Sequence, residues 1–232
     1  MTLSVGTRRV IALLFVVLLC LSTTAQTPAP NTTEWENESL KLRLFYPSDL
    51  VKGDATQVMS DGRLTLFGIS GASDPKLAEA TRCLRPVLLL EQPPSGAATQ
   101  TLTTTATILL AELDINCLTP EQQNKATNLL ADMAEVVNKI PGMKSIAQPS
   151  TYTIGWQNIH MAAAQGQPQT TNSAPSQLYT MPLSTNWNSH LLVWYFSSNS
   201  IDTLNRITKT TVRFGRDQAA PLYPLIIGNA TP

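Results

Sequence analysis

Leu191-Leu192-Val193-Trp194-Tyr195-Phe196 is a run in which every side chain is apolar. A strand with one face in water alternates polar and apolar residues, so an unbroken run of this length indicates a strand that is covered on both faces. We therefore expect residues 190–197 to form an inner strand of a sheet, with other elements packed above and below it.

The segment that follows this strand favours a helix. Ser200 is a typical N-cap residue, and Leu204 and Ile207 then lie on one helical face. We expect this helix to seal the core beside Val193 and Tyr195 and to carry no chemistry.

Other segments alternate polar and apolar residues or form short apolar runs between turn residues, and both patterns predict strands. These segments are residues 41–46, 63–69, 86–90, 101–113, 152–164 and 177–183.

Two further helices are predicted from their start signals. Thr119-Pro120-Glu121-Gln122 has an N-cap, a proline at the first helical position and a capping-box glutamine. Apolar residues then recur at helical spacing up to Ile140, where Pro141-Gly142 ends the pattern. A shorter helix is predicted after Asp74-Pro75 and leads to Cys83.

These elements predict one α+β domain over residues 39–216, with an antiparallel sheet of about six strands and helices on both faces, an α/β/α sandwich. Residues 26–38 are rich in Thr, Pro and Asn, a composition that predicts a disordered tether. Residues 217–232 contain many prolines, so we expect an extended tail that lies across the body.

Residues 1–25 have the parts of a cleavable secretory signal peptide. Arg8 and Arg9 precede an apolar stretch from Val10 to Leu21, and small residues precede Gln26. The apolar stretch has 12 residues. A membrane-spanning helix needs about 20, so we expect no integral membrane segment after cleavage.

Two variants of this signal have different consequences for the location of the protein. The Arg8-Arg9 pair occurs in twin-arginine leaders, and Cys20 is a candidate for lipid attachment. The stretch after the arginines is strongly apolar, and Leu19 stands where a small residue would precede a lipidated cysteine. The general secretory route is therefore favoured, with an exported protein in the periplasm or outside the cell.

Charged residues are sparse, and the two signs are equal in number. The chain has 16 basic and 16 acidic residues, and it contains no long run of like charge. This pattern argues against nucleic acid or an anionic membrane surface as the main partner. It leaves a protein or a small ligand, neither of which the sequence identifies.

Cys83 and Cys117 are the two cysteines that remain after the leader is removed. A pair of cysteines in an exported protein favours a disulfide, and two buried thiols are the alternative. Neither His160 nor His190 lies at a zinc-ligand spacing from them. Glycine-rich phosphate loops are also absent from the sequence, so we expect no metal and no cofactor.

Candidate catalytic groups are few. Glu91, Glu112 and Asp114 follow apolar runs, where carboxylates either converge on a pocket or mark the point at which a strand meets water. His160 is a candidate proton shuttle, but the sequence contains no serine-nucleophile motif to go with it. The sequence favours a non-catalytic binding or envelope-accessory domain, and a secreted hydrolase that uses these carboxylates or His160 is the alternative.

Trp187 is a candidate binding residue, because it is flanked by Asn186 and Asn188 rather than by apolar residues. Aromatic side chains in polar surroundings often form exposed binding platforms.

Two segments resemble the PsbP-like family. Leu42-Arg43-Leu44-Phe45-Tyr46-Pro47-Ser48-Asp49-Leu50 is similar to its opening strand and Tyr-Pro turn, and residues 190–214 are similar to its closing strand-helix-strand unit. The resemblance implies an exported α/β/α sandwich that serves as an accessory or binding protein rather than an enzyme. Leu50 stands where many relatives carry Trp, and no functional residue is transferred.

Overall fold

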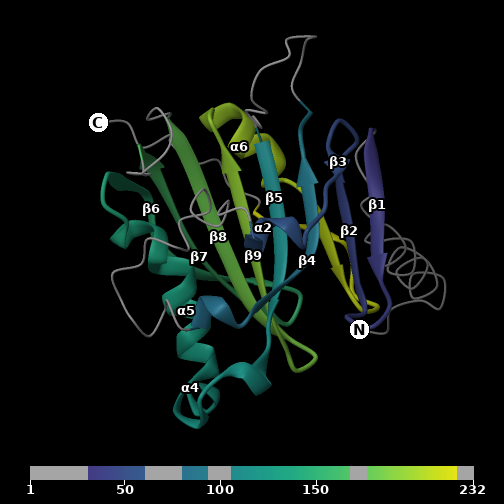
Figure 1. Cartoon of the computed structure of the whole chain (residues 1–232). Coiled ribbons are helices and arrows are strands. Elements are labelled where there is room, and N and C mark those ends of the chain that lie inside the picture. The colour runs from purple at the N-terminus through teal and green to yellow at the C-terminus, as the bar shows by residue number, and fades with distance from the viewer. Residues whose placement is uncertain (1–30, 61–79, 94–105, 168–176, 224–232) are drawn as a thin grey trace, which may run out of the picture.

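The computed structural model describes residues 31–60, 80–93, 106–167 and 177–223. These residues form two antiparallel sheets with helices packed on them (Figure 1), so the predicted α+β class is confirmed. Residues 1–30, the predicted strand over 63–69, the start of the helix after Asp74 and the chain beyond 223 lie outside the described residues.

The larger sheet has seven strands in the order β3-β4-β5-β9-β8-β7-β6. Its middle strand is β9 (His190–Ser198), which pairs with β5 (Ala106–Leu113) and β8 (Leu178–Trp187). Beyond these two lie β4 (Leu84–Glu91), β3 (Val51–Lys52), β7 (Gln157–Gly166) and β6 (Met143–Ile154). Residues 191–198 of β9 are all buried, as its apolar run predicts.

The smaller sheet has four strands in the order β1-β2-β10-β11. They are β1 (Thr32–Asn37), β2 (Leu42–Pro47), β10 (Thr211–Phe214) and β11 (Ala220–Pro221). The sequence patterns did not predict this second sheet, because they do not say which strands pair.

The prediction of a disordered tether over residues 26–38 is wrong where the chain is described. β1 pairs with β2 along its whole length, and Trp35 packs against the core. The amino-acid composition did not reveal the order of this segment. Its backbone hydrogen bonds go to a neighbouring strand, and the single aromatic ring of Trp35 anchors it to the core.

One face of the larger sheet is covered by the smaller sheet together with α6 (Ile201–Ile207). Leu192, Trp194 and Phe196 of β9 enter this core, where they meet Leu204 and Ile207 of α6. The helix therefore seals the core as predicted, but on the other side of β9 from Val193 and Tyr195. Neighbouring residues of a strand face opposite sides, and the apolar run alone did not say which side α6 covers.

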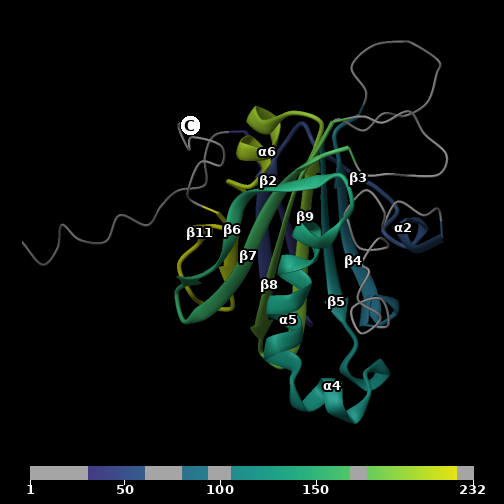
Figure 2. The same ribbon diagram turned by 90° about the vertical axis from the view of Figure 1, so that its left-hand side faces the viewer.

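The opposite face of the larger sheet is covered mainly by α5 (Ala126–Glu135), as Figure 2 shows. A 3-10 turn over Val136–Lys139 extends α5, and α4 (Pro120–Asn124) precedes it. The predicted capping box is present at the start of α4, where the hydroxyl of Thr119 accepts from the backbone N–H of Gln122. The short helix α2 (Gln57–Ser60) packs on the same face through Val58.

Two boundaries differ from the sequence prediction. β6 begins at Met143, well before the expected start at Tyr152, and it contains Pro149. The strand tolerates this proline because it is an edge strand, which needs ladder hydrogen bonds on one side only.

The sequence predicts that residues 217–232 form an extended tail. Two of them, Ala220 and Pro221, form the short strand β11, which pairs with β10. The described part of the segment then continues to Tyr223 along the body of the protein. Leu222 and Tyr223 are buried, and their backbone N–H groups donate to the carbonyls of Thr210 and Thr208. The hydroxyl of Tyr152 donates to the carbonyl of Leu222, so the C-terminal segment is held against β6.

Candidate functional site

The three carboxylates predicted as acid-base candidates do not meet. Glu91 is the last residue of β4, whereas Glu112 lies opposite Arg85 near the first residue of that strand. The six steps along the strand from Arg85 to Glu91 span about 20 Å. Carboxylates that cooperate in hydrolysis lie within about 10 Å of each other, so Glu91 cannot act with Glu112 or Asp114.

Glu112 and Asp114 each have a local partner. An oxygen of Glu112 lies 2.6 Å from Nδ1 of His190, and Asp114 pairs with Arg85. Asp114 also accepts from the backbone N–H of Asn116, which caps the 3-10 turn over Ile115–Cys117. These contacts give Asp114 a structural role at the end of β5.

His160 lies on the face of the larger sheet that α5 covers. Its Nδ1 is 3.0 Å from the hydroxyl of Thr151, the residue directly opposite on β6. Both line a cavity of about 110 Å³ together with Glu135 of α5. Burial lowers the pKa of His160, so the neutral imidazole is favoured.

Trp187 is half-buried and joins the two sheets. Its indole N–H donates to the carbonyl of Leu40 over 2.7 Å, and its ring packs against that of Phe214 at a centroid distance of 5.2 Å. Trp187 is therefore less exposed than its polar neighbours suggest, and its indole N–H is already paired within the fold. The exposed tryptophan is Trp156, at 90% exposure in the turn between β6 and β7.

Cys83 and Cys117 are bonded to each other, with their Cα atoms 5.5 Å apart. The bond ties the start of β4 to the turn that follows β5, and the backbone N–H of Asp114 donates to the carbonyl of Cys83 beside it. The predicted disulfide is therefore present in the structure.

Within the described ranges, no cluster of three His, Cys, Asp or Glu side chains is arranged to hold a metal ion. In the same part of the chain no helix is both long enough and apolar enough to cross a membrane.

A cleft of about 480 Å³ lies between the end of β2 and the C-terminal end of α6, in the size range of small-ligand sites. Phe45 and Pro47 of β2 supply apolar surface, and Thr210 lies just before β10. Arg206 and Lys209, at the end of α6 and just beyond it, bring positive charge to the rim.

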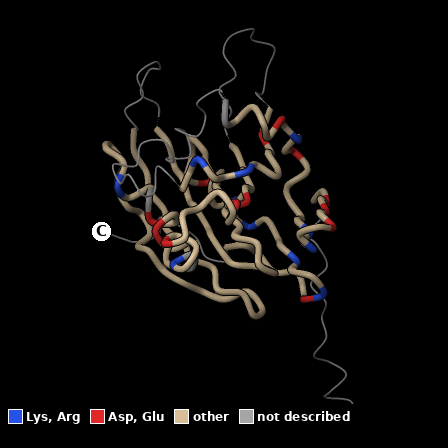
Figure 3. The backbone as a smooth tube through the Cα atoms, turned by 60° about the horizontal axis from the view of Figure 1, so that its bottom comes forward, with Lys and Arg blue, Asp and Glu red and all other residues tan. Residues whose placement is uncertain are grey.

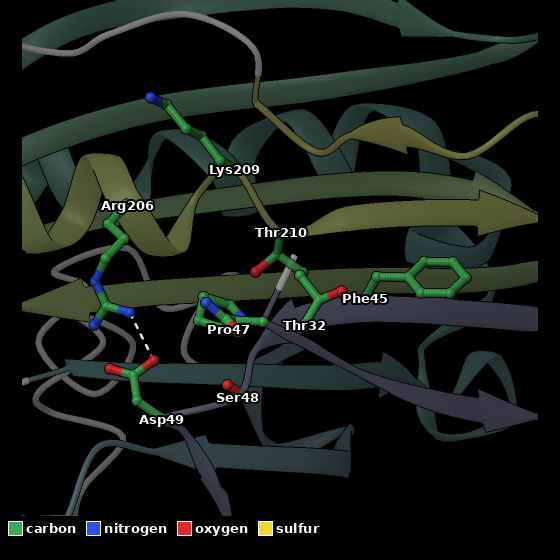
Figure 4. A pocket seen from close by; sticks show the side chains of 9 residues that line it. Thr32, Phe45, Pro47, Ser48, Asp49, Arg206, Lys209 and Thr210 are labelled. Atoms are coloured by element: carbon green, nitrogen blue, oxygen red, sulfur yellow. Dashed lines mark hydrogen bonds and ion pairs between the residues drawn. The ribbon is translucent and has the colours of Figure 1, made fainter. Parts of the chain in front are cut away.

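The charged groups of this cleft are arranged unequally (Figure 4). The guanidinium of Arg206 turns toward Asp49 and bonds it over 2.8 Å, whereas Lys209 extends away from that pair. In the described structure the ammonium of Lys209 has no hydrogen-bond or ion-pair partner. The cleft therefore has one neutralised cation and one cation that is available to a ligand.

Sequence reasoning missed this cleft. The sequence patterns indicate Phe45 and Pro47 only as parts of a strand and of the family resemblance, and they indicate no role for Arg206 or Lys209. About 160 residues separate the two groups. The two groups come together because β2 pairs with β10. The patterns in a single sequence do not show which strands pair.

No protein-family model and no curated protein matches this chain. Among solved structures it is similar to the solution structure of cyanobacterial PsbP (CyanoP) from Synechocystis sp. PCC 6803. The match has a TM-score of 0.38 and 8% sequence identity, and it covers 77% of this chain and 86% of that one. It assigns no role to any residue.

Proposed function

We propose that this chain is an exported, non-catalytic binding domain whose cleft between β2 and α6 takes a ligand with an apolar group and an anionic group. The observation that carries the proposal is that the apolar surface of Phe45 and Pro47 and the unpaired ammonium of Lys209 line the same cleft. Ligand sites commonly combine an apolar lining with a few placed polar groups.

The polar groups of the cleft favour recognition over chemistry. Arg206 is held by Asp49, and the hydroxyl of Thr210 donates to the carbonyl of Ile207 over 2.7 Å. Groups held in this way present fixed charges and acceptors to a ligand. Catalysis by nucleophilic attack would instead require a nucleophile hydrogen-bonded to a base.

Export is supported by the leader-like residues 1–25 and by the disulfide, which suits an oxidising compartment. The segments that resemble the PsbP-like family support an accessory role. Both considerations point to a partner or ligand outside the cytoplasm.

A hydrolase remains the second candidate, on one observation. Thr151 and His160 form a hydroxyl–imidazole hydrogen bond, the contact that a nucleophile makes with its base. Their cavity of about 110 Å³ is smaller than the 300 Å³ or so of typical ligand sites, and the bond is also what a cross-strand pair forms for structural reasons.

The test uses the mature chain and two probes, N-acetyl-phenylalanine and its amide, which differ only in the carboxylate. We expect the acid to shift the amide NMR signals around Phe45, Ser48 and Thr210, and the amide probe to bind more weakly. Lys209→Gln should weaken binding of the acid, whereas Lys139→Gln, an exposed lysine on the face that α5 covers, should not.

Shifts confined to other regions, or equal binding of both probes, would reject the cleft as the ligand site. Hydrolysis of a nitrophenyl ester by the wild type that is lost in both Thr151→Ala and His160→Gln would favour the hydrolase instead.

A further inference from the structure

A second hollow, of about 460 Å³, lies over the small sheet and collects positive charge. Four cations line it, and we call it the basic groove; they are Lys41, Arg43, Arg213 and Arg216. Two carboxylates, Glu36 and Glu38, line it as well. Elsewhere along the described chain acidic and basic positions are scattered, as Figure 3 shows.

The strand register forces two of these cations together. Arg43 of β2 and Arg213 of β10 are directly opposite each other in an antiparallel pair. Like charges in that position are about 5 Å apart at their Cβ atoms and destabilise a sheet. Arg43 is compensated by Glu34 and Glu36, at 3.2 and 2.8 Å.

Arg213 is not compensated in this way. Its Nε is buried and has no hydrogen-bond partner within the described ranges. A buried donor without a partner costs free energy, and an anionic group beside the partly exposed guanidinium would offset part of that cost by neutralising its charge. The side chains of Lys41 and Arg216 likewise have no partner in this part of the chain.

The backbone at the end of the groove is also constrained. Lys41 has a φ of 49°, and its carbonyl accepts from the N–H of Gly215 over 2.8 Å. A non-glycine residue in the left-handed region persists only where its surroundings fix it, and such residues are frequent at binding sites.

We propose that the basic groove binds an acidic segment of a protein partner. Guanidinium groups pair with carboxylates through two parallel hydrogen bonds, so Arg213 and Arg216 together would hold one or two carboxylates of the partner. Glu36 and Glu38 beside the cations would repel nucleic acid or an anionic membrane, whose negative charge is continuous. A polypeptide can place carboxylates over the arginines and uncharged or basic residues over the glutamates.

This inference goes beyond the cleft described above. Both sites lie on the outer face of the small sheet, because Phe45 and Arg43 are two residues apart on β2 and point the same way. The experiment distinguishes the two sites by substituting a different cation in each. Lys209 lines only the cleft, and Arg213 lines only the basic groove.

The experiment measures binding of end-blocked tetraglutamate to the mature chain by calorimetry at low ionic strength, with tetraglutamine as the uncharged probe. We expect tetraglutamate to bind more tightly, and Arg213→Gln to weaken it about tenfold, the loss of one charge-assisted hydrogen bond. Arg216→Gln, in the exposed turn after β10, is the second variant should Arg213→Gln fail to fold. Lys52→Gln, an exposed change on β3, and Lys209→Gln are the controls, and we expect each to stay within about twofold of the wild type.

Equal binding of the two peptides would overturn the proposal, as would affinities within about twofold of the wild type in both arginine variants. Tighter binding of inorganic phosphate or of vesicles rich in phosphatidylserine, in competition with the peptide, would reject a protein segment as the occupant.

Discussion

We expect His160, a half-buried imidazole, to make the stability of this protein depend on pH. Burial lowers its pKa in the folded state, so the unfolded chain binds a proton there more readily than the folded one. As pH falls below the ordinary histidine value of about 6.5, this difference destabilises the fold, whereas well above that value both states are neutral and the contribution vanishes. His160→Gln should therefore lose less stability between about pH 7.5 and about pH 5 than the wild type does.

Denaturant unfolding at the two pH values measures this difference directly. Asn158→Gln, an exposed change on the same strand that removes no titratable group, is the control, and we expect it to leave the pH dependence unchanged. The same loss of stability in the wild type and in His160→Gln would show that protonation of His160 does not affect folding.

At the scale of elements, α6 contributes to stability through one face. Leu204 and Ile207 are fully buried, whereas Asp202 in the first turn is exposed. Leu204→Ala should cost about 2–5 kcal/mol of unfolding free energy, as truncations in a packed core do. Asp202→Asn should cost less than about 1 kcal/mol, because it removes only the favourable interaction of a carboxylate with the helix dipole.

Chemical denaturation of both variants checks the assignment. If the two substitutions had equal effects, the buried face of α6 would have been misassigned.

Elements with strong local signals could be predicted from the sequence. The apolar run of β9, the capping box before α4 and the alternation of β2 each depend on residues close together in the chain, and each is present in the structure. Elements whose stability comes from a distant partner could not be predicted. β1 has a polar composition and forms because β2 pairs with it, and the first half of β6 carries a proline that only an edge position tolerates.

At the scale of the whole molecule, both candidate sites depend on contacts between the two ends of the chain. β2 pairs with β10, which brings Phe45 near Arg206 and Arg43 opposite Arg213. Sequence patterns gave the carboxylates and histidines as candidates because their chemistry is visible in the residue type. The structure separates Glu91 from the others and packs the half-buried Trp187 between the two sheets, so those candidates could not be ranked without the long-range pairing.

Trp187 gives the last test, because it connects the two sheets on which this architecture depends. Its indole N–H on β8 of the larger sheet donates to the carbonyl of Leu40, next to β2 of the smaller one. Trp187→Phe keeps an aromatic ring against Phe214 but removes the donor and leaves that carbonyl unpaired, at a cost of about 1–3 kcal/mol. Trp156→Phe is the matched control: its side chain is 90% exposed, so we expect a change of about 0.5 kcal/mol or less. Thermal and denaturant unfolding of both variants decides the matter. Equal small effects would mean that the two sheets are held together by the apolar core alone, and that the hydrogen bond between Trp187 and Leu40 adds nothing to their association.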